Sequence, residues 1–456
     1  MTEELAIVIM AAGKGTRMKS AHPKVLHRLA GATLLQHVLD TAAALGAART
    51  VVVTGAGAAA VEASVHGERV RCVRQEPQLG TGHAVQQALP ELPERGITLV
   101  LNGDVPLIEA DTARALVAAC GGERLALLTV SLADPQGYGR IVRAADGALR
   151  AIVEEKDATP EQRALREVYT GMMAAPTAAL RRWLGALGND NAQREYYLTD
   201  VVAMAVAEGT GVVGAHPRSE DEVLGVNSPA QLAELERRVQ RRRAEALMDA
   251  GVRLADPARL DVRGELLCAS DVEIDVNCVF EGRVVLGEGV RVGANCVVAD
   301  ARIDAGAVIH PFTHIEGAHV GAGARVGPYA RLRAGAELGA EVHVGNFVEI
   351  KNSTLARGAK ANHLAYLGDA TVGERVNYGA GSITANYDGA NKHRTVIGAD
   401  AHVGSNCVLV APVTVGAGAT IGGGSTIAKD APAGRLTLAR ARQVTVPGWQ
   451  RPVKVK

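Results

Sequence analysis

Apolar residues recur at every sixth position through the second half of the chain, and this period restricts the possible folds more than any other feature. A helix repeats every 3.6 residues and an isolated strand every 2, so neither produces this spacing. Shifts by one residue separate the first three runs, and a longer gap precedes the last. The members are Ile274, Phe280, Leu286, Val292, Val298, Ile303, Ile309, Ile315, Val320, Val326, Leu332, Leu338, Val344, Ile350, Ile397, Val403, Leu409, Val415, Ile421 and Ile427.

Six-residue repeats of this kind are typical of a parallel β-helix, in which the chain coils around three short, flat faces. Each apolar residue then points into a narrow prism, and Gly and other small residues serve the corners. This arrangement accounts for the 52 Gly and for an aromatic content of only 3%. Because stacked coils bury one continuous core, we expect a β-helix in residues 251–456.

Two segments depart from the period, Lys351–Tyr366 and Ala385–Lys392. The second is polar and rich in turn residues, so it is expected to loop out of the coil. Insertions in repeat proteins commonly carry the binding face. We therefore interpret both segments as insertions that contribute to a site.

Short aliphatic runs alternate with helix-like segments from Leu5 to about Asn227. Residues 5–10, 50–54 and 98–102 are typical of buried strands, and residues 33–45 have helical spacing. Such alternation predicts a mostly parallel α/β sheet. Ligands of such sheets bind beyond the carboxyl ends of the strands.

An Arg-rich segment, residues 228–250, separates the two halves. Ser228 and Pro229 suit the start of a helix. Because glutamates are interleaved with the arginines, we interpret the segment as a solvated helix that joins two domains, in preference to a nucleic-acid site. A chain of 456 residues is too long for one core, and we expect the domains to be residues 1–227 and 251–456.

Composition limits the partners and the compartment. The formal net charge is +0, which gives no support for a nucleic acid or a membrane surface as partner. The first residues lack the basic flank and the cleavage site of a signal peptide, and no apolar stretch is long enough to span a bilayer. The six cysteines form no close metal-binding pair and are expected to be free thiols. These features predict a cytoplasmic protein.

The loop after the first predicted strand is suited to phosphate. Gly13 and Gly15 let backbone N–H groups approach phosphate oxygens, and Arg17 and Lys24 add positive charge. The P-loop pattern is absent, because no Gly lies five residues before a Gly-Lys-Ser/Thr, and the dinucleotide fingerprint fails at its third glycine.

The run from Gly13 to Met18, followed by Pro23 and Lys24, resembles the signature of sugar-nucleotide pyrophosphorylases. With the repeats, the whole chain resembles the bifunctional N-acetylglucosamine-1-phosphate uridyltransferase/glucosamine-1-phosphate N-acetyltransferase family. The resemblance implies an α/β, Rossmann-like pyrophosphorylase domain with a mixed sheet, followed by a left-handed parallel β-helix, in a homotrimer. It implies that the β-helix acetylates glucosamine-1-phosphate with acetyl-CoA, and that the first domain then transfers uridylyl from UTP, giving UDP-N-acetylglucosamine and pyrophosphate.

The resemblance also implies a nucleotide and sugar site in the first domain, with Mg²⁺ held by Asp104 and Asn227. Carboxylate and amide oxygens are ligands suited to Mg²⁺. No protein nucleophile is needed, because the sugar phosphate is already an anion. The implied contacts are Met10, Ala11, Ala12, Gly13, Arg17, Lys24, Gln75, Gly80, Thr81, Asn102, Gly103, Asp104, Gly139, Glu154, Tyr169 and Asn227.

Two of these positions depart from the family pattern. Asn102 stands where the family usually has Tyr, and Tyr169 stands where an Asn normally contacts the sugar. A phenol in place of a hydrogen-bonding amide predicts an altered acetamido pocket.

In the β-helix, His363 is the expected general base, because the amine of glucosamine must lose a proton to attack the thioester and His titrates near neutrality. Glu349 is a nearby acid that would orient it. Arg333 and Lys351 suit the sugar phosphate, and Lys392 belongs to the same group of candidates. The resemblance adds Tyr366, Asn377, Asn386 and Tyr387 for the acceptor, and Ala380, Ser405, Gly423 (commonly Ala in the family) and Arg440 for acetyl-CoA.

Three alternatives stay open. His310, His314 and His319 are similar to the three-histidine zinc site of β-helical carbonic anhydrases. The β-helix could serve assembly alone, beside an active uridylyltransferase. The changes at Asn102 and Tyr169 could have ended catalysis and left a sugar-nucleotide sensor.

Overall fold

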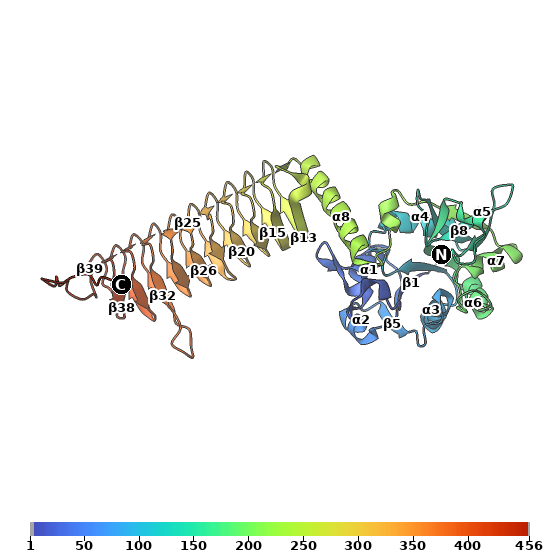
Figure 1. Cartoon of the computed structure of the whole chain (residues 1–456), viewed down its shortest axis with the longest axis horizontal. Helices are drawn as coiled ribbons and strands as arrows, with labels where there is room; N and C mark the ends of the chain where they lie inside the picture. Colours follow the sequence, from blue (N-terminus) through green and yellow to red (C-terminus); the bar gives the residue numbers. More distant parts are fainter. Residues whose placement is uncertain (1–3, 455–456) are drawn as a thin grey trace. The chain divides into compact units, whose positions relative to one another are not determined.

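Two compact units divide the chain, Met1–Arg238 and Val239–Lys456, and the computed structural model describes residues 4–454 of them (Figure 1). The boundary falls within helix α8, Pro229–Asp249. The side-chain oxygen of Ser228 accepts a backbone N–H three residues on at 3.2 Å, so it caps this helix as expected.

Ion pairs neutralise arginines of α8. Arg238 pairs with Asp221 and with Glu234, each at 2.6 Å, and Arg241 pairs with Glu245 at 2.6 Å. This charge balance is that of a solvated helix and differs from a basic surface for nucleic acid.

The first unit is built on a mixed sheet that contains the three predicted strands. β1 (Leu5–Ala11) pairs in parallel with β4 (Arg49–Thr54) on one side and with β6 (Ile97–Asn102) on the other. β10 (Glu167–Pro176) runs antiparallel between β6 and β7. The order is β11 (Val212–Ala215), β7 (Leu125–Ser131), β10, β6, β1, β4 and β5 (Val70–Arg74), with β8 (Gly139–Arg143) and β9 (Leu149–Val153) attached through β10, and β2 (Arg28–Leu29) and β3 (Ala32–Thr33) in a separate hairpin.

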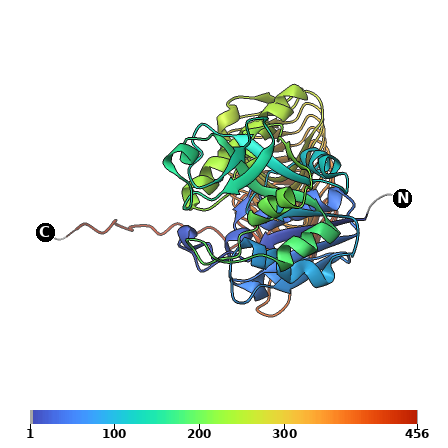
Figure 2. The ribbon, with the colours of Figure 1, turned by 90° about the vertical axis from the view of Figure 1, so that its right-hand side faces the viewer.

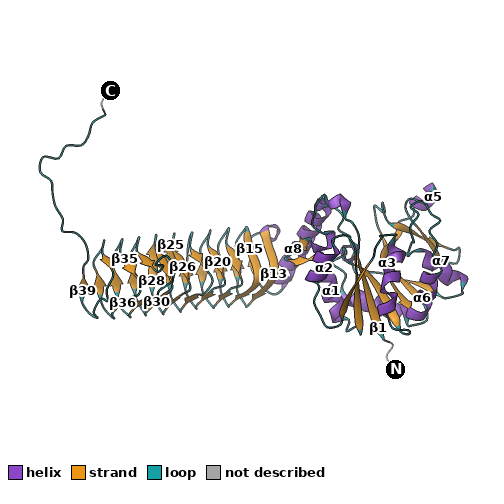
Figure 3. Cartoon of the chain, turned by 90° about the horizontal axis from the view of Figure 1, so that it is seen from below, coloured by secondary structure: helices purple, strands orange, loops and turns teal. Residues whose placement is uncertain are grey.

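Helices cover both faces of this sheet (Figure 3). One face packs against α1 (Leu34–Ala44), α2 (Ala58–Ser64) and α4 (Ala110–Cys120), and the other against α3 (Thr81–Ala88), α6 (Thr177–Gly185) and α7 (Asp200–Ala207); α5 (Pro160–Arg163) is a single turn. β1 and β6 end at the same edge, because they are parallel with Met10 opposite Asn102. No helix within residues 4–454 is long and apolar enough to cross a membrane.

The second unit is a parallel β-helix, as predicted (Figure 1). The interior confirms the six-residue period, because each predicted apolar position from Ile274 to Ile427 is at most 2% exposed. Leu332 pairs with Ile350, which is eighteen residues on, so this coil contains three hexapeptides. Each coil is therefore hydrogen-bonded to its neighbours and shares one narrow core with them.

Within residues 4–454 the strands of this unit form two sheets. The eleven-stranded sheet contains β12 (Arg253–Leu254), β14 (Glu273–Ile274), β16 (Arg291–Val292), β19 (Val308–Ile309), β22 (Arg325–Val326), β25 (His343–Asn346), β28 (Lys360–His363), β31 (Asn377–Tyr378), β34 (His402–Val403), β37 (Thr420–Ile421) and β39 (Leu436–Thr437). The seventeen-stranded sheet turns a corner to supply the other two faces, and contains β13 (Leu260–Cys268), β15 (Cys278–Leu286), β17 (Val297–Ala299), β18 (Arg302–Ile303), β20 (His314–Glu316), β21 (His319–Val320), β23 (Arg331–Leu332), β24 (Ala336–Leu338), β26 (Glu349–Lys351), β27 (Ser353–Leu355), β29 (Tyr366–Gly368), β30 (Ala370–Val372), β32 (Ile383–Ala385), β33 (Thr395–Ile397), β35 (Val408–Val410), β36 (Val413–Val415) and β38 (Thr426–Ile427).

Lys351–Tyr366 is not an insertion, contrary to the prediction. The chain continues the coil through β27, β28 and β29, and Ile350 pairs with Leu367. Leu355, Ala361 and Leu367 take the interior positions, and each is at most 1% exposed. The period is hard to see in the sequence because one interior position is held by the small Ala361 and one step spans five residues.

The second interruption does leave the coil. Val372 pairs with Ile397, which is twenty-five residues on, whereas Leu332 is paired eighteen residues on. Residues 386–394, which include the extra residues, extend beyond β32 (Figure 1) and fold back through an antiparallel bridge between Tyr387 and Lys392. The prediction of a loop in this segment is confirmed.

The two ends of the coil stack differ. At the first, the side-chain amide of Gln240 in α8 accepts the N–H of Val262 at 2.8 Å and donates to its C=O at 2.9 Å. It thus occupies both backbone groups of Val262 in β13. At the other end, residues 438–454 leave β39 without helix or strand and extend away from the coils (Figure 2).

Candidate functional sites

Two adjoining cavities at the carboxyl ends of β1 and β6 receive the expected uridyltransferase residues. Cavity A has a volume of about 420 Å³ and cavity B of about 280 Å³. Cavity A is lined by Met10, Ala11, Ala12, Gly13, Lys24, Gln75, Gly80, Thr81, Asn102 and Asp104. Cavity B shares Met10, Thr81, Asn102 and Asp104 and adds Arg17, Gly139, Glu154, Tyr169 and Asn227. Gly103 lies behind them and donates its N–H to the carbonyl of Met10 at 3.0 Å.

The two glycines of the loop after β1 differ in their surroundings. Gly15 has a φ of +57°, and a Cβ there would lie 2.7 Å from Cβ of Lys24. A side chain at Gly15 would therefore displace the lysine. A Cβ on Gly13 would meet nothing within 4 Å, so its backbone is open to cavity A. This arrangement suits the approach of phosphate oxygens to the backbone N–H groups.

A tight turn leads into α3 on the other wall of cavity A. Gly80 has a φ of +108°, and a Cβ there would lie 2.7 Å from the carbonyl oxygen of Tyr196. Gln75 is 3% exposed and donates its side-chain N–H to the carbonyl of Gly80 at 2.8 Å. The amide of Gln75 thus fixes the turn immediately before Thr81, the first residue of α3.

The ammonium group of Lys24 lies between the two oxygens that were assigned to Mg²⁺. It pairs with Oδ2 of Asp104 and donates to Oδ1 of Asn227 at 3.1 Å. One carboxylate and one amide oxygen therefore converge on a single cation. This donor set fits a hard divalent ion, and two protein ligands leave positions for phosphate oxygens and water. Elsewhere in residues 4–454, no group of three or more His, Cys, Asp and Glu side chains is arranged for a metal.

Cavity B contains a buried phenol. Tyr169 is 6% exposed, and its hydroxyl has no hydrogen-bond partner within residues 4–454. Burial, and then the charge of Glu154, raises the pKa of Tyr169 well above its ordinary value, so the phenol stays a neutral donor. Burial also raises the pKa of Glu154, against a hydrogen bond from Thr199 at 3.1 Å. Asn102, on the neighbouring strand, donates to the carbonyl of Thr170 at 3.2 Å.

One corner of the β-helix carries His363 and the expected acetyl-CoA residues in a single row. The carbonyls of His363, Ala380 and Ser405 each accept an N–H from the next coil. These residues and Gly423 therefore stand on successive coils, roughly 5 Å apart. Arg440, beyond the last strand, donates to the carbonyl of Gly423 at 2.7 Å.

The ring of His363 is held by Asn346, whose Oδ1 lies 2.9 Å from Nδ1. An N–H on Nδ1 that donates to this oxygen leaves Nε2 with the lone pair that a base needs. Glu349 does not orient His363, contrary to the prediction. Its carboxylate accepts from Arg333 at 2.9 Å and pairs with Arg331 at 3.7 Å. The reason is register, because Asn346 pairs with His363 across β25 and β28 whereas Glu349 belongs to β26 on the next face.

The expected acceptor residues are spread over the next face and the loop. Tyr366 begins β29, and Lys351 ends β26. The ammonium group of Lys392 lies close enough to Lys351 to lower its pKa by charge repulsion. A pair of cations suits a phosphate. Tyr387 is exposed on the loop, and Asn377 in β31 lies on the face that ends at the His363 corner.

Two polar residues of this region were missed by the sequence reasoning, Asn346 and Asp369. Asp369 is 7% exposed, and its carboxylate accepts from the side-chain amide of Asn352 at 2.5 Å and from that of Asn386. The sequence holds no distinct signal for Asp369, since its corner position is Gly335 and Asn352 on the two preceding coils and already an acid, Asp300, on an earlier one.

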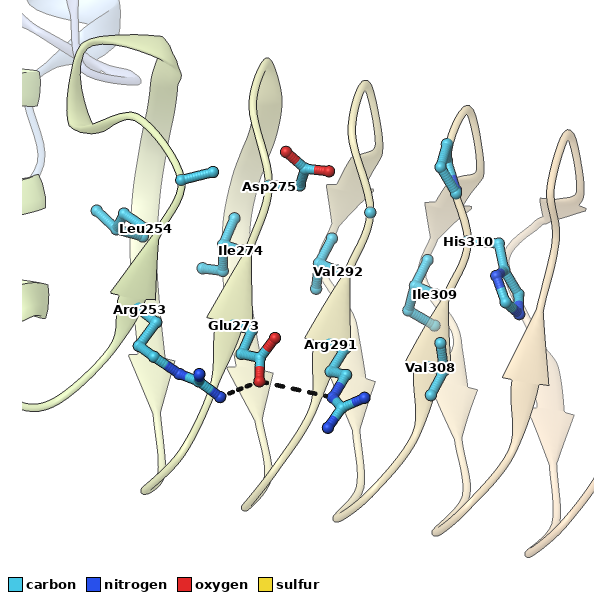
Figure 4. Close-up of a pocket in the computed structure, with 13 residues that line it drawn as sticks. Arg253, Leu254, Glu273, Ile274, Asp275, Arg291, Val292, Val308, Ile309 and His310 are labelled. Carbon is cyan, nitrogen blue, oxygen red and sulfur yellow. Dashed lines mark hydrogen bonds and ion pairs between the residues drawn. The ribbon is translucent and has the colours of Figure 1, made fainter.

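A groove of about 480 Å³ lies over the first coils, away from the expected site residues (Figure 4). Glu273 lies between Arg253 and Arg291 there and pairs with both, at 3.6 Å to Arg291. His310 borders this groove. His319 is instead held by Asp304 at 2.8 Å, so the described residues do not gather the histidines of the zinc alternative into one site.

Comparison with known families divides the chain in the same order. Residues 7–253 match the family of MobA-like NTP transferase domains. Residues 262–356 match the GMPPB C-terminal domain, and residues 394–429 match six repeats of the bacterial transferase hexapeptide.

Full-length relatives share most of the sequence. A bifunctional protein GlmU of Methylibium petroleiphilum is 76% identical, with 99% of each chain covered. Proteins of the same name from Paracidovorax citrulli and Polaromonas naphthalenivorans are 68% and 69% identical over 99% of this chain, and 99% and 98% of their own lengths are covered.

Proposed function

Because the chain belongs to the family of bifunctional GlmU proteins, we propose which of its residues perform each of two reactions. The protein acetylates glucosamine-1-phosphate with acetyl-CoA and transfers uridylyl from UTP to the N-acetylglucosamine-1-phosphate so formed. The product, UDP-N-acetylglucosamine, serves cell-wall synthesis. Two alternative hypotheses, a β-helix that serves assembly alone and a sugar-nucleotide sensor without catalysis, are therefore set aside. We also propose a cytoplasmic location.

Uridylyl transfer is proposed for residues 1–227, with UTP in cavity A and the sugar phosphate in cavity B. Both cavities reach Asp104, so the two phosphates would meet beside it. A sugar phosphate oxygen bonds to the α-phosphorus, the bond to pyrophosphate breaks, and Arg17 and Lys24 balance the leaving charge. The reaction requires a divalent metal. We propose Mg²⁺, held by Asp104 and Asn227, which would neutralise phosphate charge.

Acetyl transfer is proposed for residues 251–456, and the row that joins His363 to the acetyl-CoA positions is the observation that carries it. Nε2 of His363 takes a proton from the amine as nitrogen attacks the thioester carbon. The N–C bond forms, the C–S bond breaks, and the CoA thiolate receives the proton from the imidazolium. Lys351, Lys392 and Arg333 would hold the phosphate, and Arg440 would border the CoA.

The homotrimer is proposed from an exposed aromatic row that flanks His363. Phe312, Tyr329 and Phe347 stack on successive coils, with ring centroids 4.8 and 5.4 Å apart, and are 48–56% exposed. Leu364, which follows His363 directly, continues the row and is 62% exposed. A continuous apolar stripe of this kind is typical of an interface. A second copy that covered it would also enclose His363, so assembly and acetyl transfer would depend on the same surface.

The residue assignment is tested with two variants and one mixture of glucosamine-1-phosphate, acetyl-CoA, UTP and Mg²⁺. His363→Ala should lose acetylation and still convert added N-acetylglucosamine-1-phosphate to UDP-N-acetylglucosamine. Asp104→Ala should do the reverse and accumulate N-acetylglucosamine-1-phosphate, as measured by mass spectrometry. If either substitution abolished both reactions in a folded protein, two independent sites would be the wrong assignment.

A further inference from the structure

Asp369 occupies a corner of the β-helix between the two parts of the proposed acceptor site. Its φ is +51°, in the left-handed region, and its side chain is buried. One carboxylate oxygen accepts from Asn352 on the preceding coil, at 2.5 Å, and the other accepts from Asn386, the first residue of the loop. Its backbone carbonyl accepts the N–H of Thr395, where the chain returns to the coil, at 3.2 Å. One residue therefore fixes both ends of the loop.

The loop between these anchors carries two of the proposed acceptor residues. Tyr387 and Lys392 form the bridge that closes it. Asn386 is 8% exposed and donates its amide N–H to Asp369, so it is anchored in the protein. The part of Asn386 in the reaction is then to hold its neighbour Tyr387.

The charge of Asp369 also suits this position. Lys351 and Lys392 place two like charges close together, which repel unless an anion lies near. Burial opposes the charged form of Asp369, yet the hydrogen bonds from Asn352 and Asn386 and the charges of both lysines together lower its pKa. The carboxylate therefore stays ionised and balances part of the lysine charge before the sugar phosphate arrives.

We propose that Asp369 is a positioning residue of the acetyl transfer, which anchors the loop of residues 386–394 so that Lys392 and Tyr387 meet the phosphate of glucosamine-1-phosphate. The inference rests on the proposed acceptor site. A general structural role of Asp369 would affect the binding of both substrates, whereas this proposal predicts an effect on the binding of glucosamine-1-phosphate only. The acetyl-CoA row at the His363 corner belongs to another edge of the coil and is independent of this anchor.

The test is Asp369→Asn, which keeps the size of the side chain but replaces one acceptor with a donor that faces the amide of Asn386 or Asn352. A lost hydrogen bond to a charged group typically weakens an interaction tenfold or more. We expect the KM for glucosamine-1-phosphate to rise about tenfold, with the KM for acetyl-CoA and the rate of uridylyl transfer within twofold. Amide hydrogen exchange in residues 386–394 should become faster, and this readout does not depend on activity.

Two further variants make the result specific. Asp369→Asn combined with Asn386→Asp exchanges donor and acceptor, and it should restore slow exchange in the loop and most of the KM. Asp300→Asn changes another left-handed corner acid, whose carboxylate accepts the N–H of Arg283 at 3.0 Å, and it should alter neither quantity.

An unchanged KM and unchanged loop exchange in Asp369→Asn would refute the anchor. Equal increases of both KM values together with a lower melting temperature would also refute it, because they would show a general weakening of the prism. A faster loop with an unchanged KM would leave the anchor in place but overturn its part in binding. Lys392→Ala tests the proposed acceptor site independently of the Asp369 anchor. An unchanged KM for glucosamine-1-phosphate in that variant would contradict the acceptor site itself.

Discussion

Leu367→Ala is expected to destabilise the β-helix by about 4 kcal/mol. Leu367 is 0% exposed and directly follows Lys351–Tyr366, the segment that was predicted to be an insertion, in the coil that this segment forms. The coils on both sides hold its strand by parallel pairing, to Ile350 on one side and through Tyr366 and Ile383 on the other. The cavity left by the lost methyl groups therefore cannot collapse, which places the cost in the upper part of the usual range.

Calorimetry with tryptophan fluorescence would measure this change for the β-helix separately. Trp183 is 1% exposed in the first unit, and Trp449, the second of two tryptophans, is 67% exposed. The fluorescence change on unfolding thus reports the unfolding of the first unit. A calorimetric transition without a fluorescence change belongs to the β-helix. That transition should shift down, with acetylation lost at a lower temperature than uridylyl transfer.

Leu267→Ala is the matched control, because it makes the same chemical change at a side chain that is 40% exposed in the same unit. It should cost less than about 1 kcal/mol. If Leu367→Ala lowered the transition no further than Leu267→Ala, the segment would not be a packed coil and the reasoning from burial would fail.

Three other substitutions give separate tests. Tyr169→Phe should not lower the free energy of unfolding, because the hydroxyl that it removes has no partner within residues 4–454; a thermal melt showing a loss above about 1 kcal/mol would contradict this. Asn346→Ala frees the ring of His363, so kcat for acetylation should fall about tenfold in steady-state assays while uridylyl transfer is kept; an unchanged kcat would exclude the positioning role. The backbone N–H of Asn391 is the first of several groups that lower the pKa of Asp388. Because the folded pKa is depressed, this carboxylate stabilises the loop fully above the ordinary value near 4, and the contribution is lost as the pH falls below it. Hydrogen-exchange protection of the loop should therefore drop below about pH 4 in the natural chain and change less in Asp388→Asn; equal profiles would contradict the assignment.

The repeating core could be predicted from the sequence, because a six-residue spacing of apolar residues is typical of one fold, the parallel β-helix. The interior positions from Ile274 to Ile350 are large and apolar, and therefore visible in the sequence. The coil through Ala361 is not, because a small residue holds one of its interior positions and a step of five residues breaks the count. Only coil-to-coil pairing, which is a tertiary property, reveals that the period continues.

Some residues of the candidate sites could likewise be predicted from the sequence, and others could not. Gly15 and Gly80 could be recognised from sequence, because each adopts a positive φ, a backbone conformation that favours glycine. Glu349 was a reasonable partner for His363 by distance along the chain, but a coil places a residue beside the one about seventeen positions away, which here is Asn346. Asp369 was missed for the same reason, since its partners are one coil back and one loop ahead. Side-chain pairs across coils follow from register and cannot be read from local spacing.

A coil that ends in open backbone groups can accept another chain as its next coil, and repeated addition would build a fibre. The amide of Gln240 satisfies the N–H and the C=O of Val262 together, as a peptide group of an additional strand would. Helix α8 thus covers this edge of the coil stack, and Arg243, which also donates to the C=O of Val262, assists Gln240 there. Replacing Gln240 with a residue that cannot accept a hydrogen bond would leave the N–H of Val262 open to another chain, although every coil behind it would stay intact.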